Sequence, residues 1–187
     1  EGESRRQYLK QARKYFLYVI SSYERKDMPV PEDRRNADVY FNHGQILFET
    51  GHYEKALRDL DKAMALAKHR VDMLVMYADT LYKMNRYKEA VKYYQEMLDS
   101  DLDKAHAYFY LGKIHLVRDQ REKAKGYFLK CIALGDKAYP KAHKHLGDIF
   151  REKRLRKKAI DHYRTFLKLT PANDPAAEDL KASLKRL

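Results

Sequence analysis

Residues 108–131, YFYLGKIHLVRDQREKAKGYFLKC, contain the pattern that decides the fold. The first half carries a stripe with the i, i+3, i+4 and i+7 spacing of one helix face: Tyr108, Leu111, Gly112 and His115. The second half carries a similar stripe: Ala124, Phe128 and Cys131. Because the turn-forming residues Asp119 and Gln120 separate the two stripes, the stretch predicts two helices joined by a short turn.

The same pattern returns along the chain with a fixed period. One series of small residues is spaced 34, 34 and 35 apart: Gly44, Ala78, Gly112 and Gly147. A second series has the same spacing: Ala56, Ala90, Ala124 and Ala159. Where two helices cross closely, only Gly or Ala fits, and a mid-helix Gly costs about 1 kcal/mol against Ala. A repeated helical hairpin whose two helices touch at the small residues explains both series.

The repeat resembles the tetratricopeptide repeat family. Its small, aromatic, Ala, aromatic and Pro positions are matched in the last unit by Gly147, Phe150, Ala159, Tyr163 and Pro171. The chain departs from the family pattern in having no Trp and no inter-repeat Pro in the first three units. The resemblance covers residues 37–173 and predicts an all-α, right-handed superhelical solenoid of antiparallel helix pairs. We expect four repeats: 37–70, 71–104, 105–139 and 140–173.

Different elements are expected at the two ends. Residues 1–36 predict an amphipathic helix followed by a linker around Pro29 and Pro31. The packed side of that helix is expected to carry Tyr8, Ala12, Tyr15, Phe16, Val19, Ile20 and Tyr23. Whether this helix is half of a further repeat stays open. Residues 174–187 predict a capping helix that begins at Asp174-Pro175.

Composition leaves the compartment of the protein open. The formal charge is +12, from 39 Lys and Arg against 27 Asp and Glu, and both signs are mixed through most of the chain. The single cysteine, Cys131, allows no internal disulfide, and the apolar runs are too short for a membrane-spanning helix. Since the sequence begins at Glu1 instead of Met, we expect that an N-terminal segment has been removed or left out, and a targeting or lipid-attachment segment could have been lost with it.

The resemblance implies that the first helix of each repeat lines a concave groove that binds a segment of another protein. The lining positions are Phe41, Gln45, Phe48, Val75, Asp79, Tyr82, Phe109, Lys113, Leu116, Lys144 and Arg151. Since aromatic and aliphatic residues dominate the first three repeats and basic residues the fourth, we expect an apolar or amphipathic segment with its acidic end at the fourth repeat. The alternative is that the N-terminal helix or another copy of the chain covers these rings.

Two other kinds of binding surface stay open. A basic patch lies at the turn of the fourth repeat: Lys153, Arg154, Arg156, Lys157 and Lys158. It could bind nucleic acid or an anionic membrane surface, although the acidic residues of the middle repeats argue against nucleic acid. The 16 tyrosines cannot all be core residues, which leaves an oligomeric structural component as a further alternative.

The sequence offers no candidate for catalysis, a metal site or a cofactor. It has no phosphate-binding glycine loop, nucleophile elbow or zinc-protease motif. His143 and His145 point apart on a helix, and His43, His115 and His143 fall in the buried stripes. Phe41 and Gln45 stand where the chaperone-binding members of the family carry Lys and Asn, so no chaperone cofactor is predicted. We therefore expect a non-enzymatic scaffold or adaptor.

Overall fold

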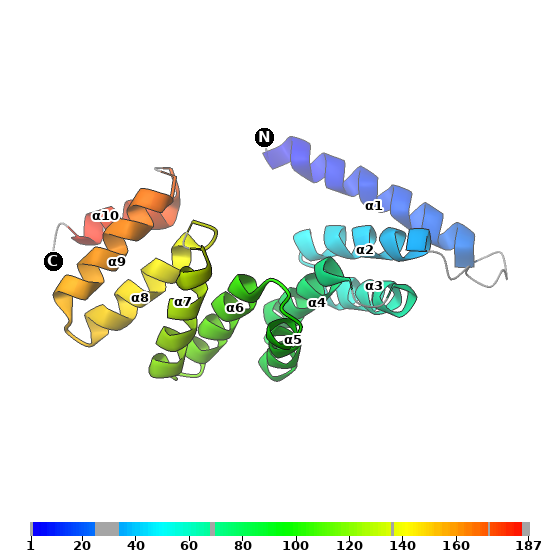
Figure 1. Cartoon of the computed structure of the whole chain (residues 1–187). Coiled ribbons are helices and arrows are strands. Elements are labelled where there is room, and N and C mark those ends of the chain that lie inside the picture. The colour runs from blue at the N-terminus through cyan, green and yellow to red at the C-terminus, as the bar shows by residue number, and fades with distance from the viewer. Residues whose placement is uncertain (1, 25–33, 68–69, 136, 172, 185–187) are drawn as a thin grey trace. The chain divides into compact units, whose positions relative to one another are not determined.

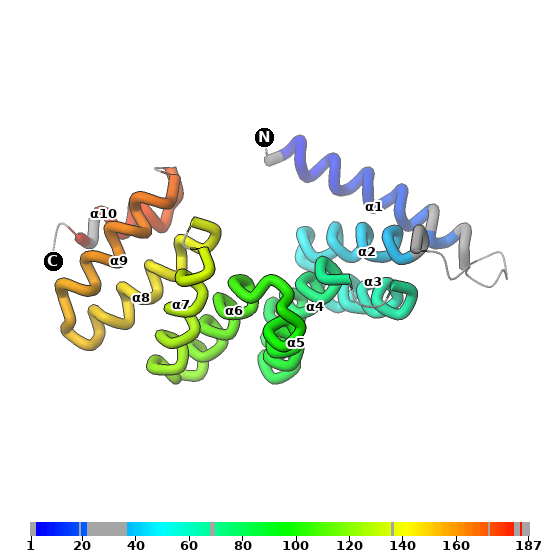
Figure 2. The backbone as a smooth tube through the Cα atoms, viewed as in Figure 1, coloured from blue at the N-terminus to red at the C-terminus, as the bar shows by residue number. Residues whose placement is uncertain are grey.

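The computed structural model describes residues 2–24, 34–67, 70–135, 137–171 and 173–184, which form ten helices and no strand (Figures 1 and 2). The helices are α1 (Gly2–Glu24), α2 (Arg34–Glu49), α3 (Tyr53–Leu66), α4 (Val71–Lys83), α5 (Tyr87–Asp99), α6 (Lys104–Val117), α7 (Arg121–Gly135), α8 (Pro140–Glu152), α9 (Arg156–Leu169) and α10 (Pro175–Leu184). No described helix has the length and hydropathy needed to cross a lipid bilayer. The linker expected around Pro29 and Pro31 lies outside the described residues.

The chain divides into two compact units, residues 1–96 and 97–187. Unit 1 holds α1 and the first two repeats, α2–α3 and α4–α5, and the division falls within the last turn of α5. Unit 2 holds the hairpins α6–α7 and α8–α9, followed by α10. In each repeat we call the two members the first helix and the second helix. The expected fold class, an all-α helical-repeat solenoid, is confirmed.

Each hairpin turns at one residue in the left-handed backbone region, five positions before the alanine of the second helix. The residues with positive φ at these turns are Gly51, Asn85, Asp119 and Arg154. The residue after each of them donates its backbone N–H to a carbonyl five residues back in the first helix, as in His52 to Leu47 at 2.8 Å and Gln120 to His115 at 2.8 Å. This is the Schellman arrangement that ends helices, and it fixes how tightly the pair folds back.

The first and second helices meet where the sequence places its small residues. A Cβ added at Gly112 would lie 2.7 Å from Cε1 of Phe128, and one added at Gly147 would overlap the ring of Tyr163. Both rings are completely buried. Burying an aromatic side chain stabilises the fold by about 1.5–3 kcal/mol, which exceeds the cost of placing Gly inside a helix. The glycines therefore make room for the rings that hold each pair together.

The core of unit 1 joins α1 to the first repeat and the first repeat to the second. Its cluster contains Ile20 of α1, Ala37 and Tyr40 of α2, Ala63 of α3, Ala67 directly after α3, and Met73 of α4. The expectation for α1 is partly wrong. Ile20 is buried and Ala12 and Phe16 are partly buried, but Tyr8 and Tyr15 are exposed. Within the described residues, α2 packs on the side of α1 that holds Ile20, and the two tyrosines lie outside this contact.

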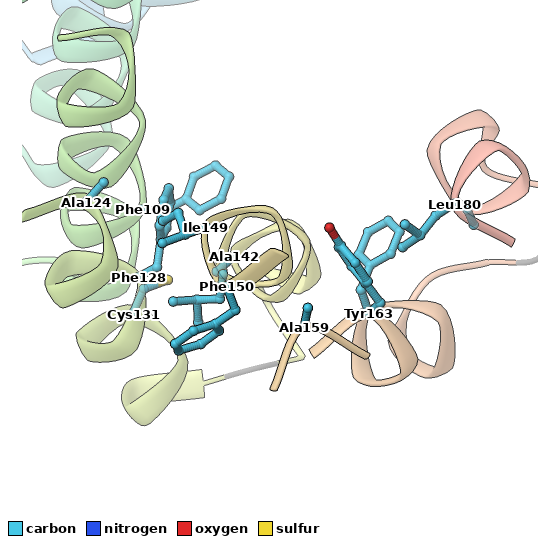
Figure 3. Packing of buried hydrophobic residues seen from close by; sticks show 13 residues of the cluster. Phe109, Ala124, Phe128, Cys131, Ala142, Ile149, Phe150, Ala159, Tyr163 and Leu180 are labelled. Carbon is cyan, nitrogen blue, oxygen red and sulfur yellow. The ribbon is translucent and has the colours of Figure 1, made fainter. Parts of the chain in front are cut away.

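The core of unit 2 runs from α6 to α10. Figure 3 shows Phe109 and Phe128 beside α8, Tyr163 on α9 and Leu180 on α10, all members of one cluster. The capping helix begins as its sequence predicts, because Oδ1 of Asp174 accepts the backbone N–H of Ala176 at 2.8 Å. Leu180 is buried against the cluster, so α10 covers the apolar side of the last hairpin.

The close approach predicts opposite effects for two Gly→Ala substitutions. Gly147→Ala should lower the free energy of unfolding by about 1–3 kcal/mol, because the new Cβ displaces the buried Tyr163 ring. Gly126→Ala, in the middle of α7 with no atom within 4 Å of the added Cβ, should raise it by up to about 1 kcal/mol. Urea unfolding followed by circular dichroism measures both. Equal effects of the two substitutions would contradict the packing argument.

Candidate protein-binding surface

Two aromatic pairs stand at equivalent places in the repeats of unit 1. The ring of Phe48, in the last turn of α2, lies 5.6 Å from that of Tyr53, the first residue of α3. The rings of Tyr82 in α4 and Tyr87 in α5 are also 5.6 Å apart. Burial raises the pKa of Tyr82 above its ordinary value. All four rings are only half-buried, so each pair offers a fixed aromatic edge at the end of a first helix.

The other expected lining residues of unit 1 differ in how far they are exposed. Phe41 is half-buried beneath Arg70, whose guanidinium carbon lies 5.4 Å from the ring centroid. Arg70 also pairs with Asp72 at 2.6 Å and with Asp38, and these carboxylates raise its pKa above the ordinary range. Val75 is half-buried and Gln45 is exposed. Phe41 is thus covered on one side by a cation that its own repeat supplies.

Two carboxylates on the first helices each bind a tyrosine of their own repeat. Asp79 accepts the hydroxyl hydrogen of Tyr94 at 2.7 Å, and Asp148 accepts that of Tyr163 at 2.8 Å. Both tyrosine rings are completely buried, and burial followed by the bond to Asp148 raises the pKa of Tyr163. The helical spacing of the sequence predicted Asp79 as a lining residue of the groove but did not predict its hydrogen bond with Tyr94. The signal was there, because an Asp after the small residue occurs only in the two repeats whose second helix carries Tyr at this position.

Phe109 corrects the expectation for the third repeat. Only 7% of its surface is exposed, and its ring packs against Phe128 at 6.0 Å and Tyr139 at 5.2 Å. It is therefore mainly a core residue, and its removal would weaken the fold itself. Lys113 lies on the outside of this cluster, with Nζ 5.6 Å from the Phe109 centroid and 5.0 Å from that of Tyr110. On the outer side of α6, the ammonium group of Lys113 is therefore accessible, whereas the ring of Phe109 is buried.

Three expected lining residues of unit 2 meet at one cavity. Leu116 from α6 and Lys144 and Arg151 from α8 border a pocket of about 530 Å³. The pocket is completed by Arg121, His145, Asp148, Ile149, Glu152, Ala176, Asp179 and Leu180. The sequence did not predict that α10 helps to line this pocket, because its apolar edge was already explained by the role of a capping helix. The pocket combines an apolar wall with a charged rim. In such a pocket the apolar wall holds a side chain of a ligand, and the polar groups set its orientation.

The rim of this pocket is not uniformly basic, as the fourth repeat was expected to be. Nζ of Lys144 lies 3.0 Å from Asp148 and a guanidinium nitrogen of Arg151 lies 3.8 Å from the same carboxylate. Arg121 pairs with Glu152. The expected positive wall is therefore a network of both signs. A ligand carboxylate would bind Lys144 and Arg151 in competition with Asp148.

The basic patch lies at the turn between α8 and α9 and in the first turn of α9. All five of its side chains are exposed, and Lys153 pairs with Glu122 of α7. The first turns of the second helices α3 and α7 carry Glu54 and Glu122, whereas α9 carries Lys157 at the corresponding position and no acidic residue. Positive charge at a helix N-terminus is unfavourable by a few tenths to about 1 kcal/mol.

Cys131, His43 and His143 are buried, whereas His115, which was also expected in a buried stripe, is only partly buried. Nδ1 of His143 lies 3.0 Å from Nδ1 of His162 between α8 and α9, while His145 stacks on Phe128 at 5.0 Å. His143 and His145 thus point to different neighbours, as predicted. Burial raises the pKa of Cys131 to about 12, which keeps its thiol protonated at neutral pH. Within the described ranges, no three His, Cys, Asp or Glu side chains are grouped so that they could hold a metal ion.

These features define a helical-repeat protein of the protein-binding class. A sequence profile of the family described as anaphase-promoting complex, cyclosome, subunit 3 matches residues 28–97, and one of the tetratricopeptide repeat matches residues 75–138. These matches and the fold support the tetratricopeptide repeat family. Its fold is that of a protein-protein interaction scaffold, and proteins of this family bind peptides or other proteins.

Curated relatives match the chain over a part of their own length. It is 27% identical over 147 residues to the BBSome complex member BBS4 homolog of Drosophila melanogaster, covering 72% of the chain and 30% of that protein. It is 28% identical over 139 residues to the human protein O-mannosyl-transferase TMTC1, covering 72% of the chain and 16% of that protein. The chain therefore spans less than a third of either relative.

Solved structures share the fold across most of the chain. A crystal structure of MamA matches with a TM-score of 0.69 and 17% identity, covering 97% of this chain and 95% of that one. The structure of YrrB, described as a TPR protein with an unusual peptide-binding site, matches with a TM-score of 0.64 and 19% identity, covering 98% and 87%. At these identities the likeness shows the fold alone.

The environment of His145 predicts a stability that depends on pH. Burial lowers its pKa from 6.5 to about 4, so the unfolded chain takes up a proton on this imidazole before the folded chain does. The free energy of unfolding should fall as the pH drops from about 6.5 to about 4, by at most about 1.4 kcal/mol per pH unit from this group. Urea unfolding across that range should show a shallower dependence for His145→Gln. Identical pH dependence of the variant and the parent would rule the explanation out.

Proposed function

We propose that this chain is a non-enzymatic adaptor that holds a segment of a partner protein on the exposed sides of its first helices. The pocket beside α8 carries the proposal, since it combines the apolar Leu116 with the charged Lys144 and Arg151 from positions that the family uses for binding. The unusual peptide-binding site described for YrrB supports the same use of the fold. The non-enzymatic part rests on the family, whose repeats are generally scaffolds without catalysis.

The contacts favour a segment that is apolar in one part and acidic in another. In unit 1, the aromatic pairs at Phe48 and Tyr82 offer ring edges whose positions are already fixed, so little side-chain entropy is lost on binding. In unit 2, Lys144 and Arg151 share one carboxylate, Asp148, which leaves hydrogen-bond donors of both groups for an acidic ligand. We expect the acidic end of the bound segment at the fourth repeat, because the paired donors lie there.

The lining residues of unit 1 can be tested without disturbing the core. In the double variant Phe48→Ala with Tyr82→Ala, both ring pairs lose a member that is only half-buried. In affinity capture from cells that make the protein, quantified by mass spectrometry, this variant should capture at least tenfold less of the specific partner than the parent chain does. A matched control is Leu129→Ala with Leu134→Ala, which truncates two exposed residues of α7. Unchanged capture by the first variant, with native circular dichroism, would reject this surface.

The lining residues of unit 2 are tested separately from those of unit 1. Lys144→Gln with Arg151→Gln should weaken capture of the same partner and make the remaining binding less dependent on salt, because attraction to an acidic segment is screened. Binding of the captured partner, measured between about 50 and 300 mM salt, should then give a smaller slope than the parent chain. An unchanged slope would contradict an acidic end at the fourth repeat.

A second candidate function is binding of an anionic surface by the basic patch. Two features of the patch cost stability: Arg154 has a left-handed φ of 59° without being Gly, Asn or Asp, and Lys157 lies at the N-terminus of α9. Residues that oppose the local fold are often kept for function. This candidate requires a partner rich in phosphate groups, such as nucleic acid or an anionic membrane surface.

One substitution tests whether the patch trades stability for binding. Lys157→Glu restores the charge that α3 and α7 carry at the same place, so the free energy of unfolding should rise by about 0.3–1 kcal/mol. If the patch binds phosphate groups, the same variant should lose affinity for phosphatidylserine vesicles or single-stranded RNA. Failure of the parent chain to bind either probe at about 50 mM salt would remove this second candidate.

A further inference from the structure

Helix α1 has the register of a second helix. In two complete repeats, the residue eight positions after the small alanine packs against a core cluster that includes a residue of the following helix. Met64 of α3 contacts the cluster that includes Met73 of α4, and Ile132 of α7 contacts the one that includes Ala142 of α8. In α1 the residue eight positions after Ala12 is Ile20, and it is buried against α2.

In the complete repeats, the residue three positions after the alanine contacts the first helix. Tyr93 lies 4.8 Å from Tyr77, and Tyr127 lies 5.1 Å from His115, between ring centroids. In the remaining two repeats this contact joins polar groups: His43 to Asp59 at 2.5 Å and His143 to His162 at 3.0 Å. The third position after the alanine therefore faces the first helix in all four repeats.

The residue six positions after the alanine also reaches the first helix in two of the repeats. Nζ of Lys62 lies 4.9 Å from the ring centroid of Tyr40, and that of Lys130 lies 5.5 Å from that of Tyr108. Counting from Ala12, the third, fourth and sixth positions in α1 are Tyr15, Phe16 and Tyr18. These side chains therefore occupy the positions that a first helix covers elsewhere in the chain.

This side of α1 is open and aromatic. Tyr15 is 65% exposed, and Tyr8 and Tyr18 are each 70% exposed, while Ala12 and Phe16 are only partly buried. We call these five residues the tyrosine face. The two rings of Tyr15 and Phe16 after Ala12 match the sequence Ala90, Tyr93, Tyr94 and the sequence Ala124, Tyr127, Phe128, where the small residue lets a first helix approach. The face thus has the residue pattern of a second helix, and in the described part of the chain its tyrosines are exposed.

The usual hairpin turn is also missing from α1. The left-handed residue lies five positions before the alanine in every complete repeat, and the corresponding residue of α1 is Gln7. Gln7 lies inside α1, which runs without a break from Gly2. Within the described residues, α1 therefore lacks the three-residue turn that joins the two helices of the other repeats.

Charge identifies the kind of helix that fits. From residue 4 to residue 21, α1 carries five basic side chains and no acidic one: Arg5, Arg6, Lys10, Arg13 and Lys14. Arg5 donates to Glu49 of α2 at 2.9 Å, whereas Arg6, Lys10 and Lys14 are exposed. A second copy of α1 would bring like charges together, which disfavours a symmetric pair. An acidic helix would gain attraction from the same groups.

We propose that the tyrosine face of α1 docks an amphipathic helix of a partner protein that has Gly or Ala at its centre and acidic residues along its flanks. Bound there, the helix completes a repeat in trans, with its small residue against Ala12 and Phe16 and its larger residues between the tyrosines. This surface is separate from the lining residues of the first helices. The proposal therefore stands or falls independently of the proposed function.

A peptide built from the chain itself is a suitable probe. The first helix α4 packs on Ala90, Tyr93 and Tyr94, a sequence similar to Ala12, Tyr15 and Phe16 of α1, so we choose a stapled helical peptide of residues 71–84 with Glu in place of Lys83. Titration into the full ¹⁵N-labelled chain should shift amide resonances of α1 and give a dissociation constant below about 1 mM. A control peptide with Leu in place of Ala78 should bind at least tenfold more weakly, because its crossing point is no longer small.

Variants of the chain locate the binding. Ala12→Leu and, separately, Tyr15→Ser with Tyr18→Ser should each reduce the affinity at least tenfold, since both positions are at the surface and tolerate change. Leu17→Ser is the matched control, because Leu17 is 45% exposed on the same helix and away from the tyrosine face. Phe48→Ala with Tyr82→Ala should leave the peptide affinity unchanged. No binding of the peptide at about 1 mM, or a peptide affinity that Ala12→Leu leaves unchanged, would overturn the proposal.

Two further measurements identify other occupants. If phosphatidylserine vesicles bind the chain and the tyrosine double variant does not, the face belongs to a membrane surface and the proposal fails. If sedimentation shows a dimer that Tyr15→Ser with Tyr18→Ser dissociates, a second copy is the occupant and the proposal fails as well. The proposal is supported if the chain is a monomer, does not bind the vesicles and binds the peptide through α1.

Discussion

The contact between a small residue on a first helix and a large side chain on the second helix is the constraint on which each repeat depends. Gly112 leaves room for Phe128, and Gly147 leaves room for Tyr163. Because both rings are completely buried, the backbones approach closely and the remaining stripe residues can fill the flanking space. The hairpin turn, the stacking of the next helix and the outward direction of the lining residues all follow from this one crossing.

The repeat architecture could be predicted because it is written in the sequence four times. A single Gly in a helix has several explanations, but Gly44, Ala78, Gly112 and Gly147 at one period have only one that also explains the four alanines. The cap at Asp174 was equally accessible, because an N-cap residue followed by Pro acts through local backbone geometry. Patterns that depend on local spacing and on repetition were therefore sufficient for the fold.

The surface could be predicted only in part, because exposure and pairing depend on neighbours that periodicity does not show. Phe109 has the spacing of a lining residue, yet Phe128 and Tyr139 enclose it. Asp148 was not expected to neutralise the basic fourth repeat while also binding Tyr163. The tyrosines of α1 have the spacing of a packed face, yet Tyr8, Tyr15 and Tyr18 are exposed in the described structure. Each of these outcomes depends on a tertiary contact between residues that are far apart in the repeat pattern.

The central claim concerns a contact that can be observed directly in solution. In the NMR spectrum, the Hα protons of Gly112 and Gly147 should show nuclear Overhauser effects to the rings of Phe128 and Tyr163, together with ring-current displacement of their chemical shifts. The Hα protons of Gly126, which has no neighbouring ring within reach, provide the internal reference. Glycine resonances at Gly112 and Gly147 that match those of Gly126, without effects from the rings, would contradict the account.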